Sequence, residues 1–201
     1  MRPLDAAALA AWLGAFADDV AEHEAELTDL DRRIGDADHG TNMRRGMTAV
    51  AALPPEGTAA EYAKRAAMTL ISTVGGAAGP LYGTFLLRLA AALPADGPIS
   101  ADQWSDALAA GVRGVADRGK AVRGDKTMLD ALLPALDAFT TATTDPWAAA
   151  AEAAARGRDD TVDLVARKGR ASYLGERSRG TADPGATSAT LLIQAAARTL
   201  T

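Results

Sequence analysis

The chain has 201 residues, 48% of them hydrophobic and 23% charged, which predicts a single domain over 1–201 with a sizeable apolar core. Its formal net charge of -5 argues against nucleic acid as a partner, because phosphate backbones call for a basic protein face. The chain has no cysteine, so disulfides and thiolate metal sites are excluded. No segment is apolar enough for a leader peptide or a membrane span, so neither export nor membrane insertion is expected, and a cytoplasmic location is.

The first predicted element is one long amphipathic helix from Leu9 to near Gly35. Its apolar residues recur at steps of three and four: Leu9, Trp12, Leu13, Phe16, Val20, Leu27 and Leu30. His23 lies on the same stripe and is expected to be packed. Asp31 continues the stripe at the C-terminal end of the helix, where a carboxylate is unfavourable unless a cation compensates its charge. Asp31 is therefore the strongest candidate for a metal ligand in this helix.

Three carboxylates and a histidine follow one another around glycines between residues 31 and 40. They belong to Asp31, Asp36, Asp38 and His39. Carboxylate oxygens suit Mg²⁺, which keeps open positions for water and phosphate oxygens, so the group predicts a metal-bound nucleotide. The alternative, helix capping and surface charge neutralised by neighbouring arginines, suits any one aspartate better than three at this spacing. A calcium-binding EF-hand is excluded, because Met47 stands where a bidentate glutamate is needed.

Seven further helices are predicted downstream, with glycine and proline confined largely to the gaps between them. Their ranges are 42–52, 58–73, 80–93, 101–117, 126–142, 146–167 and 187–200. Many of these segments are rich in alanine, which favours long helices packed closely together. No alternating pattern is long enough for a sheet, so the predicted fold class is all-α. The short connections imply an up-and-down bundle or a closed ring of about eight antiparallel helices.

Two connections between predicted helices contain glycines that resemble phosphate-binding loops. The segment 75–80 can bring N–H groups to an anion at the start of the next helix, although a tight helix corner is the simpler interpretation of an isolated glycine-rich turn. The segment 114–120 begins like a P-loop, but Ala121 replaces the metal-binding hydroxyl and a helix precedes it instead of a strand. Asp125 is instead expected to cap a helix that begins at Lys126.

The longest connection covers residues 168–186 and is both glycine-rich and basic. Long ordered loops in compact domains usually carry function. Lys168, Arg170, Arg177 and Arg179 supply the local positive charge that an acidic protein needs to hold a polyphosphate. We therefore expect this loop to lie over the phosphates of a nucleotide.

Four segments in this order resemble the motifs of the nucleotide-binding L subunit of dihydroxyacetone kinase. They are GDADHGTNM at 35–43, GGAAGPLYG at 75–83, RGK at 118–120 with GDKTM at 124–128, and ARKGRASYLGERS at 166–178 followed by DPGATS at 183–188. The resemblance therefore runs through nearly the whole chain. It implies a barrel of eight antiparallel helices with the nucleotide site at one rim, which agrees with the helix count from periodicity.

The resemblance also implies the residues of the site. Asp31, Asp36 and Asp38 would hold two Mg²⁺ ions that bridge the phosphates of ADP or ATP. The nucleotide would be surrounded by His39, Gly40, Thr41 and Asn42 at the phosphates, by the backbone amides of Ala77 and Ala78, and by Gly119, Met128, Arg170, Asp183, Pro184 and Gly185. No covalent catalytic residue is implied, because phosphoryl transfer depends mainly on positioning and charge neutralisation. The chain departs from the family at Ala78, where a serine is usual, so only the backbone amide is left for the phosphates.

The activity that the resemblance implies is that of a phosphotransferase subunit. It would pass a phosphoryl group from its nucleotide to dihydroxyacetone held on a separate K subunit. In the branch linked to the sugar phosphotransferase system, ADP is a fixed cofactor that a multiphosphoryl M subunit rephosphorylates, and a free-standing chain favours this branch. Two alternatives stay open: an ATP-dependent L-type subunit for dihydroxyacetone or another small ketose, and a nucleotide-sensing module that binds a transcription regulator. A homodimer also stays open.

Overall fold

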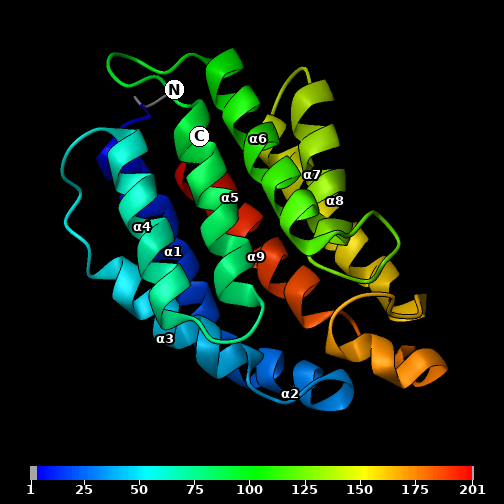
Figure 1. Ribbon diagram of the computed structural model, residues 1–201. Helices are drawn as coiled ribbons and strands as arrows, with labels where there is room; N and C mark the ends of the chain where they lie inside the picture. Colours follow the sequence, from blue (N-terminus) through cyan, green and yellow to red (C-terminus); the bar gives the residue numbers. More distant parts are fainter. Residues whose placement is uncertain (1–3, 201) are drawn as a thin grey trace.

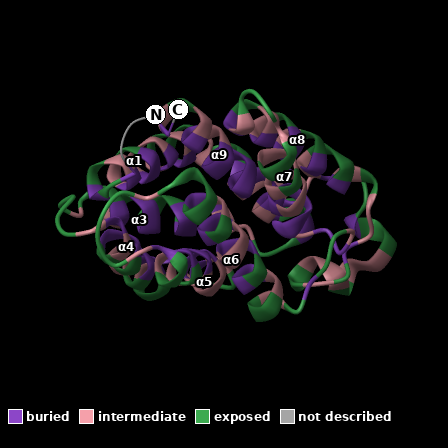
Figure 2. Ribbon diagram, turned by 90° about the horizontal axis from the view of Figure 1, so that it is seen from above, coloured by how far each residue is buried: buried purple, intermediate pink, exposed green. Residues whose placement is uncertain are grey.

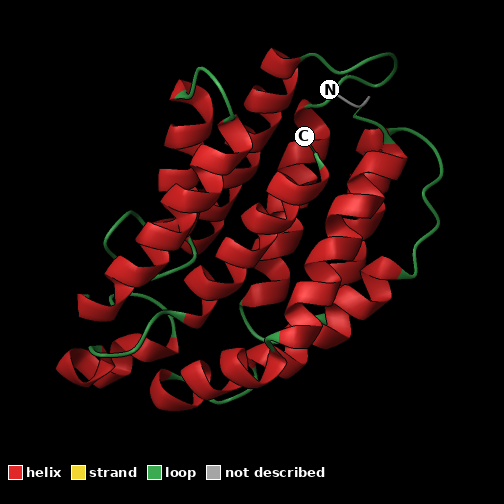
Figure 3. Cartoon of the chain, turned by 180° about the vertical axis from the view of Figure 1, so that it is seen from behind, coloured by secondary structure: helices red, strands yellow, loops and turns green. Residues whose placement is uncertain are grey.

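Helices make up most of the chain that the structure describes, residues 4–200 of a computed structural model (Figures 1 and 3). In chain order they are α1 (Ala6–Glu22), α2 (Glu24–Ile34), α3 (His39–Ala51), α4 (Ala59–Thr73), α5 (Ala78–Ala92), α6 (Ala101–Gly119), α7 (Leu129–Thr141), α8 (Pro146–Asp160), the 3-10 helices η1 (Thr161–Asp163) and η2 (Arg170–Ser178), and α9 (Pro184–Thr199). No strand occurs within residues 4–200, so the predicted all-α class is confirmed. None of the helices in this range is both long and apolar enough to cross a membrane.

Eight of the helices pack in a succession that returns to its start. The order of neighbours is α1, α3, α4, α5, α6, α7, α8 and α9, and α9 packs back on α1. Seen from above, α1, α9, α8 and α7 lie along one side, and α3, α4, α5 and α6 along the other (Figure 2). α2 lies across one end of this ring and packs on α3, α9 and η2 (Figure 1). This arrangement fits the predicted ring of about eight helices.

Apolar side chains fill the interior of the ring. Trp12 is fully buried and meets Phe85 and Trp104 edge to face, at ring-centroid distances of 6.5 Å and 6.0 Å. The indole N–H of Trp12 donates to the Leu192 carbonyl at 2.9 Å, so this side chain is buried without an unpaired polar atom. This aromatic group ties α1, α5, α6 and α9 together in the interior of the ring.

The prediction of one helix from Leu9 to near Gly35 is wrong, because the chain bends at His23 between α1 and α2. His23 has φ -97° and ψ 12°, its ring is only half-buried, and its Nδ1 lies 2.9 Å from the Asp19 carbonyl oxygen. Leu27 is nevertheless buried, so the apolar spacing continues across the bend and concealed it from the sequence. The bend lets α2 leave the ring and cross its end.

Two other predicted boundaries need correction. The helix predicted over 146–167 ends at Asp160 and is followed by η1. The helix predicted from Lys126 begins at Leu129, so Asp125 does not cap it; the Asp125 carboxylate accepts the Val122 N–H at 2.9 Å instead. The remaining predicted helices agree with the structure to within a few residues at each end. The predicted 168–186 loop contains η2.

Candidate functional site

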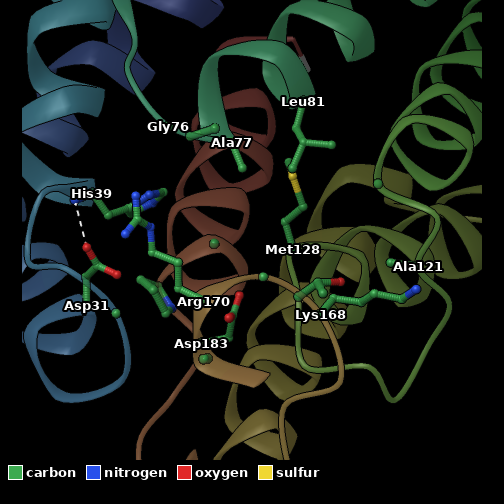
Figure 4. A pocket seen from close by; sticks show the side chains of 18 of the residues that line it. Asp31, His39, Gly76, Ala77, Leu81, Ala121, Met128, Lys168, Arg170 and Asp183 are labelled. Atoms are coloured by element: carbon green, nitrogen blue, oxygen red, sulfur yellow. Dashed lines mark hydrogen bonds between the residues drawn. The ribbon is translucent and has the colours of Figure 1, made fainter. Parts of the chain in front are cut away.

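A cavity of about 460 Å³ opens at the end of the ring that α2 crosses (Figure 4). Its walls are the end of α2, the beginnings of α3, α5 and α9, the end of α6 with the connection to α7, and residues 168–171. These last residues belong to the segment 161–182 between α8 and α9, which we call the flap. Figure 4 shows Asp31, His39 and Arg170 at one end of the cavity and Met128 and Ala121 toward the other. The cavity therefore has a charged end and an apolar end.

Three carboxylates converge at the charged end. Asp31, Asp36 and Asp38 each offer an oxygen atom, and these oxygens lie within 4.8 Å of one another. The buried Asp31 carboxylate orders the loop by accepting the N–H groups of Asp38 at 2.8 Å and His39 at 3.1 Å. Carboxylates this close repel one another unless a cation neutralises them, and oxygen donors in such a group suit a hard divalent ion.

Gly35 is required where α2 ends beside this cluster. A Cβ atom at Gly35 would lie 2.0 Å from Oδ1 of Asp31, inside the carboxylate. Ala37 takes a left-handed backbone conformation, with φ 64°, in the turn between Asp36 and Asp38. The glycine and this turn together bring the two loop aspartates back toward the end of α2.

The flap brings a cation to the carboxylates. Nη2 of Arg170 lies 3.1 Å from Oδ2 of Asp36, and the arginine side chain is 70% exposed. Lys168 also lines the cavity but lies beside Met128 and Ala121 (Figure 4), so Arg170 is the flap residue placed to meet phosphate oxygens at the charged end. Arg177 and Arg179 were predicted to share this task, but neither is among the lining residues, and Arg179 pairs with Glu176 on the flap itself.

A chain of hydrogen bonds fixes His39 at the first position of α3. Nε2 of His39 lies 2.9 Å from Oγ of Ser188, which lies 2.7 Å from the hydroxyl of Tyr82 and also donates to the Gly185 carbonyl. Burial lowers the pKa of His39, against the opposing effect of the Asp31 and Asp38 carboxylates, so the ring is neutral at pH 7. Burial also raises the pKa of Tyr82, which stays a phenol.

Two helices begin at the cavity, and the first of them, α5, has backbone donors there that no side chain caps. α5 begins at Ala78, after a turn in which Gly76 takes the left-handed φ of 65°. α9 begins at Pro184, and its cap Asp183 accepts the Ala186 N–H at 2.7 Å. The first N–H groups of a helix have no partner within it and carry partial positive charge, so this end of the ring favours an anion.

Asp183 is a buried carboxyl whose pKa is raised to about 7, mainly by burial. The N–H of Ala186 and the ammonium of Lys126 oppose this shift, whereas Asp130 adds to it. Near neutral pH this group therefore exists in both protonation states. Its place at the start of α9 makes it part of the cavity wall.

The structure gathers nearly all the predicted site residues in one place. Besides Arg177 and Arg179, only Gly40 and Thr41 among them do not line the cavity. Gly40 faces α2, and Thr41 is exposed with its hydroxyl donating to the Asp38 carbonyl at 3.0 Å. Tyr82 and Lys126 were not predicted as site residues, although they lie within the motifs at 75–83 and 124–128.

Comparison with known proteins identifies the family. The DAK2 domain model matches residues 33–198. The chain belongs to the DAK2 domain family. The ADP-binding subunit DhaL of the PEP-dependent dihydroxyacetone kinase of Escherichia coli (strain K12) is 42% identical over 192 residues, which cover 91% of each chain. The ADP-binding subunit DhaL of the PTS-dependent dihydroxyacetone kinase of Lactococcus lactis is 42% identical over 188 residues, covering 91% of this chain and 92% of that one.

A solved structure shares the fold of this DAK2 domain. The dihydroxyacetone kinase of C. freundii in complex with AMP-PNP and Mg²⁺ superposes with a TM-score of 0.75 and 26% identity. The match covers 94% of this chain and 33% of the kinase, so the chain spans about a third of that protein's length. The family membership predicted from the motifs is thus confirmed, and the relatives are subunits or whole chains of phosphotransferases.

Proposed function

We propose that this chain is the ADP-binding phosphotransferase subunit of a dihydroxyacetone kinase. It passes a phosphoryl group from its nucleotide to dihydroxyacetone held on a separate K subunit. The observation that carries the proposal is the convergence of Asp31, Asp36 and Asp38 with Arg170 at the charged end of one cavity. The 42% identity to ADP-binding DhaL subunits over more than nine-tenths of both chains supports the same reading.

The two ends of the cavity suit the two ends of a nucleotide. At the apolar end, Leu81, Ala121 and Met128 offer a surface for a base, as ligand cavities of a few hundred Å³ commonly do. At the charged end, Asp31, Asp36 and Asp38 would hold two Mg²⁺ ions, which supply charge neutralisation and orientation for the phosphates. The division of the cavity therefore orients an ADP or ATP molecule with its terminal phosphate toward α2 and the flap.

The chain's own groups position the phosphates in this proposal. The first amides of α5, at Ala77 and Ala78, and the guanidinium of Arg170 donate to the phosphate oxygens. His39, Asn42 and the Asp183–Gly185 turn shape the remaining wall. No nucleophile is needed, because a loose phosphoryl transfer depends on alignment and on stabilisation of charge on the transferred group.

The relatives that match over about nine-tenths of their own length support one choice of phosphoryl donor. Those relatives are PEP-dependent or PTS-dependent kinases, so we propose that ADP stays bound and is rephosphorylated by an M subunit of the phosphotransferase system. L-erythrulose kinases are 34% identical, but the chain spans only about a third of their length. An ATP-dependent kinase of another ketose is therefore the second candidate. A cytoplasmic location stays a prediction.

Reconstitution with purified partners tests the proposal. With a K subunit, dihydroxyacetone and the phosphotransferase components, we expect dihydroxyacetone phosphate to form from phosphoenolpyruvate, with ADP retained by the purified protein. Asp38→Asn should abolish transfer, whereas Asp29→Asn, a surface aspartate of α2 paired with Arg32 and Arg33, should not. Formation only from free ATP would favour the second candidate. ADP binding without transfer to any acceptor would favour a sensor and refute the proposal.

A further inference from the structure

One lysine of the cavity wall is buried and bound entirely to backbone oxygens. Lys126 is 1% exposed, and its Nζ donates to the carbonyls of Thr161, Ser178 and Thr181, each at 2.7 Å, and of Leu164 at 3.2 Å. An ammonium has three N–H donors, so the longest contact shares a donor with a shorter one. Among the described residues, no carboxylate forms an ion pair with this ammonium.

The four acceptors come from the two ends of the flap. Thr161 and Leu164 stand where the flap begins, and Ser178 and Thr181 stand where it returns to α9. Two backbone bonds lie beside these contacts. Gly180 donates to Val162 at 2.8 Å and joins the two ends of the flap, whereas Arg167 donates to Asp125, the neighbour of Lys126, at 3.0 Å and joins the flap to the connection between α6 and α7. The ammonium thus lies at the point where both ends of the flap meet the connection between α6 and α7.

The residues next to this point line the cavity from opposite sides. Thr127 and Met128 follow Lys126 directly and belong to the apolar wall. Arg170 lies on the flap and belongs to the charged end, beside Asp31 and His39 (Figure 4). One side chain therefore links the wall predicted to hold the base with the segment predicted to hold the phosphates.

The backbone of Lys126 indicates that the side chain fixes the local structure. Its φ of 62° lies in the left-handed region, which is unfavourable for a residue other than glycine. The carbonyl bonds of the side chain offset that cost. The geometry also requires the charged form, because a neutral amine has two N–H donors and would turn its lone pair toward a carbonyl oxygen. Burial lowers the pKa of Lys126, while the carboxylates of Asp183 and Asp163 act to raise it.

We propose that Lys126 is a positioning residue whose ammonium holds both ends of the flap and so places Arg170 over the phosphate end of the cavity. The proposal rests on the proposed function for its consequence in nucleotide binding, but its structural part stands without it. Lys126 acts through the flap; its Nζ faces the flap carbonyls.

The test compares Lys126→Met with a matched control, Lys120→Met. Lys120 is exposed, also has a left-handed backbone with φ 49°, and lies at the end of α6 in the same connection. In ligand-free protein, we expect Lys126→Met to lose hydrogen-exchange protection at the Arg167 and Gly180 amides. We also expect it to weaken ADP binding about tenfold or more, since several charge-assisted bonds are lost. The control should change neither. Unchanged protection in Lys126→Met would overturn the proposal.

Chemical rescue separates this role from a general loss of stability. In Lys126→Ala, added methylammonium should enter the space among the four carbonyl oxygens and restore both flap protection and ADP affinity. Tetramethylammonium at the same ionic strength, which has no N–H donor, should restore neither. Rescue by both cations, or by neither in a folded variant, would overturn the proposal.

A measurement on the wild type covers the case in which the variants do not fold. The ammonium protons of Lys126 should exchange slowly enough to be observed by nitrogen-15 NMR, with couplings to carbonyl carbons of the flap. A fast-exchanging Lys126 resonance without such couplings would overturn the proposal. If the wild type shows a protected flap but binds no ADP, the proposed function fails and the role of Lys126 in holding the flap stands.

Discussion

Gly40→Ala tests whether the spacing of α2 and α3 positions the carboxylates. A Cβ atom at Gly40 would lie 2.2 Å from the Glu24 carbonyl oxygen, 2.3 Å from the Thr28 hydroxyl and 2.9 Å from the Thr28 nitrogen. Two of these atoms are backbone, so no side-chain rotation relieves the clash. Reaching an ordinary contact of 3.4 Å moves the α2 backbone by about 1.2 Å. Overpacking of this kind typically costs about 1–3 kcal/mol of unfolding free energy.

The movement has a direct consequence for the metal site. Asp31 belongs to α2, whereas Asp36 and Asp38 lie on the loop that leads into α3, so a shift of α2 spreads the three carboxylates. Mg²⁺ tolerates little departure from its ligand distances of about 2.0–2.1 Å. We therefore expect Gly40→Ala to weaken Mg²⁺-dependent ADP binding about tenfold or more, because a displaced carboxylate no longer reaches the ion.

Calorimetric titration with ADP and Mg²⁺, together with thermal unfolding, measures both effects. The control is Gly14→Ala in α1, where the new methyl group meets nothing within 4 Å and should stabilise the helix by up to about 1 kcal/mol. If Gly40→Ala is destabilised as expected but binds like the wild type, the close approach of α2 and α3 does not position the site, and the reasoning is refuted.

Three further predictions use single side chains of the cavity wall. Ala78→Ser restores a hydroxyl at the first position of α5 and should leave ADP affinity unchanged or tighter by titration; a large loss would show that this turn does not face the phosphates. Ser188→Ala removes the partner that His39 and Tyr82 share, and should lower the unfolding free energy by about 2 kcal/mol in urea; a change below about 0.5 kcal/mol would contradict the network. Asp183 binds its proton more tightly in the native state, where its pKa is about 7 against 3.8 for an ordinary aspartate. Its contribution to the free energy of unfolding therefore falls as the pH rises from 3.8 to about 7, by at most about 1.4 kcal/mol per pH unit, and stays constant at higher pH. Asp183→Asn should lack that slope in urea unfolding from pH 5 to 8, and parallel curves for the two proteins would refute the assignment.

The parts of the site that the sequence predicted are local. Asp31, Asp36 and Asp38 lie within eight positions of one another, so helix spacing and a glycine turn were enough to expect that they converge. Helix periodicity likewise predicted the fold class and most helix boundaries, because amphipathic stripes report which face is buried. The bend at His23 escaped prediction, since the stripe continues on both sides of it.

The parts that the sequence did not predict depend on contacts between distant segments. The acceptors of Lys126 are backbone carbonyls 35 to 55 residues away, and a carbonyl carries no residue-type signal. Ser188 reaches Tyr82 over 106 residues and His39 over 149. Arg177 and Arg179 were predicted from local basic charge alone, but the turns of η2 direct them away from the cavity lining. Composition indicates that a loop is basic, but only the fold decides which of its side chains reach the site.

The most direct test of the central claim is a titration of nucleotide-free protein with ADP in the presence and absence of Mg²⁺, using the wild type, Asp36→Asn and the control Asp29→Asn. The account predicts that the wild type and Asp29→Asn bind ADP tightly only with Mg²⁺, and that Asp36→Asn loses this metal-dependent gain. ADP binding that is equally tight in all three proteins, with or without the metal, would contradict it.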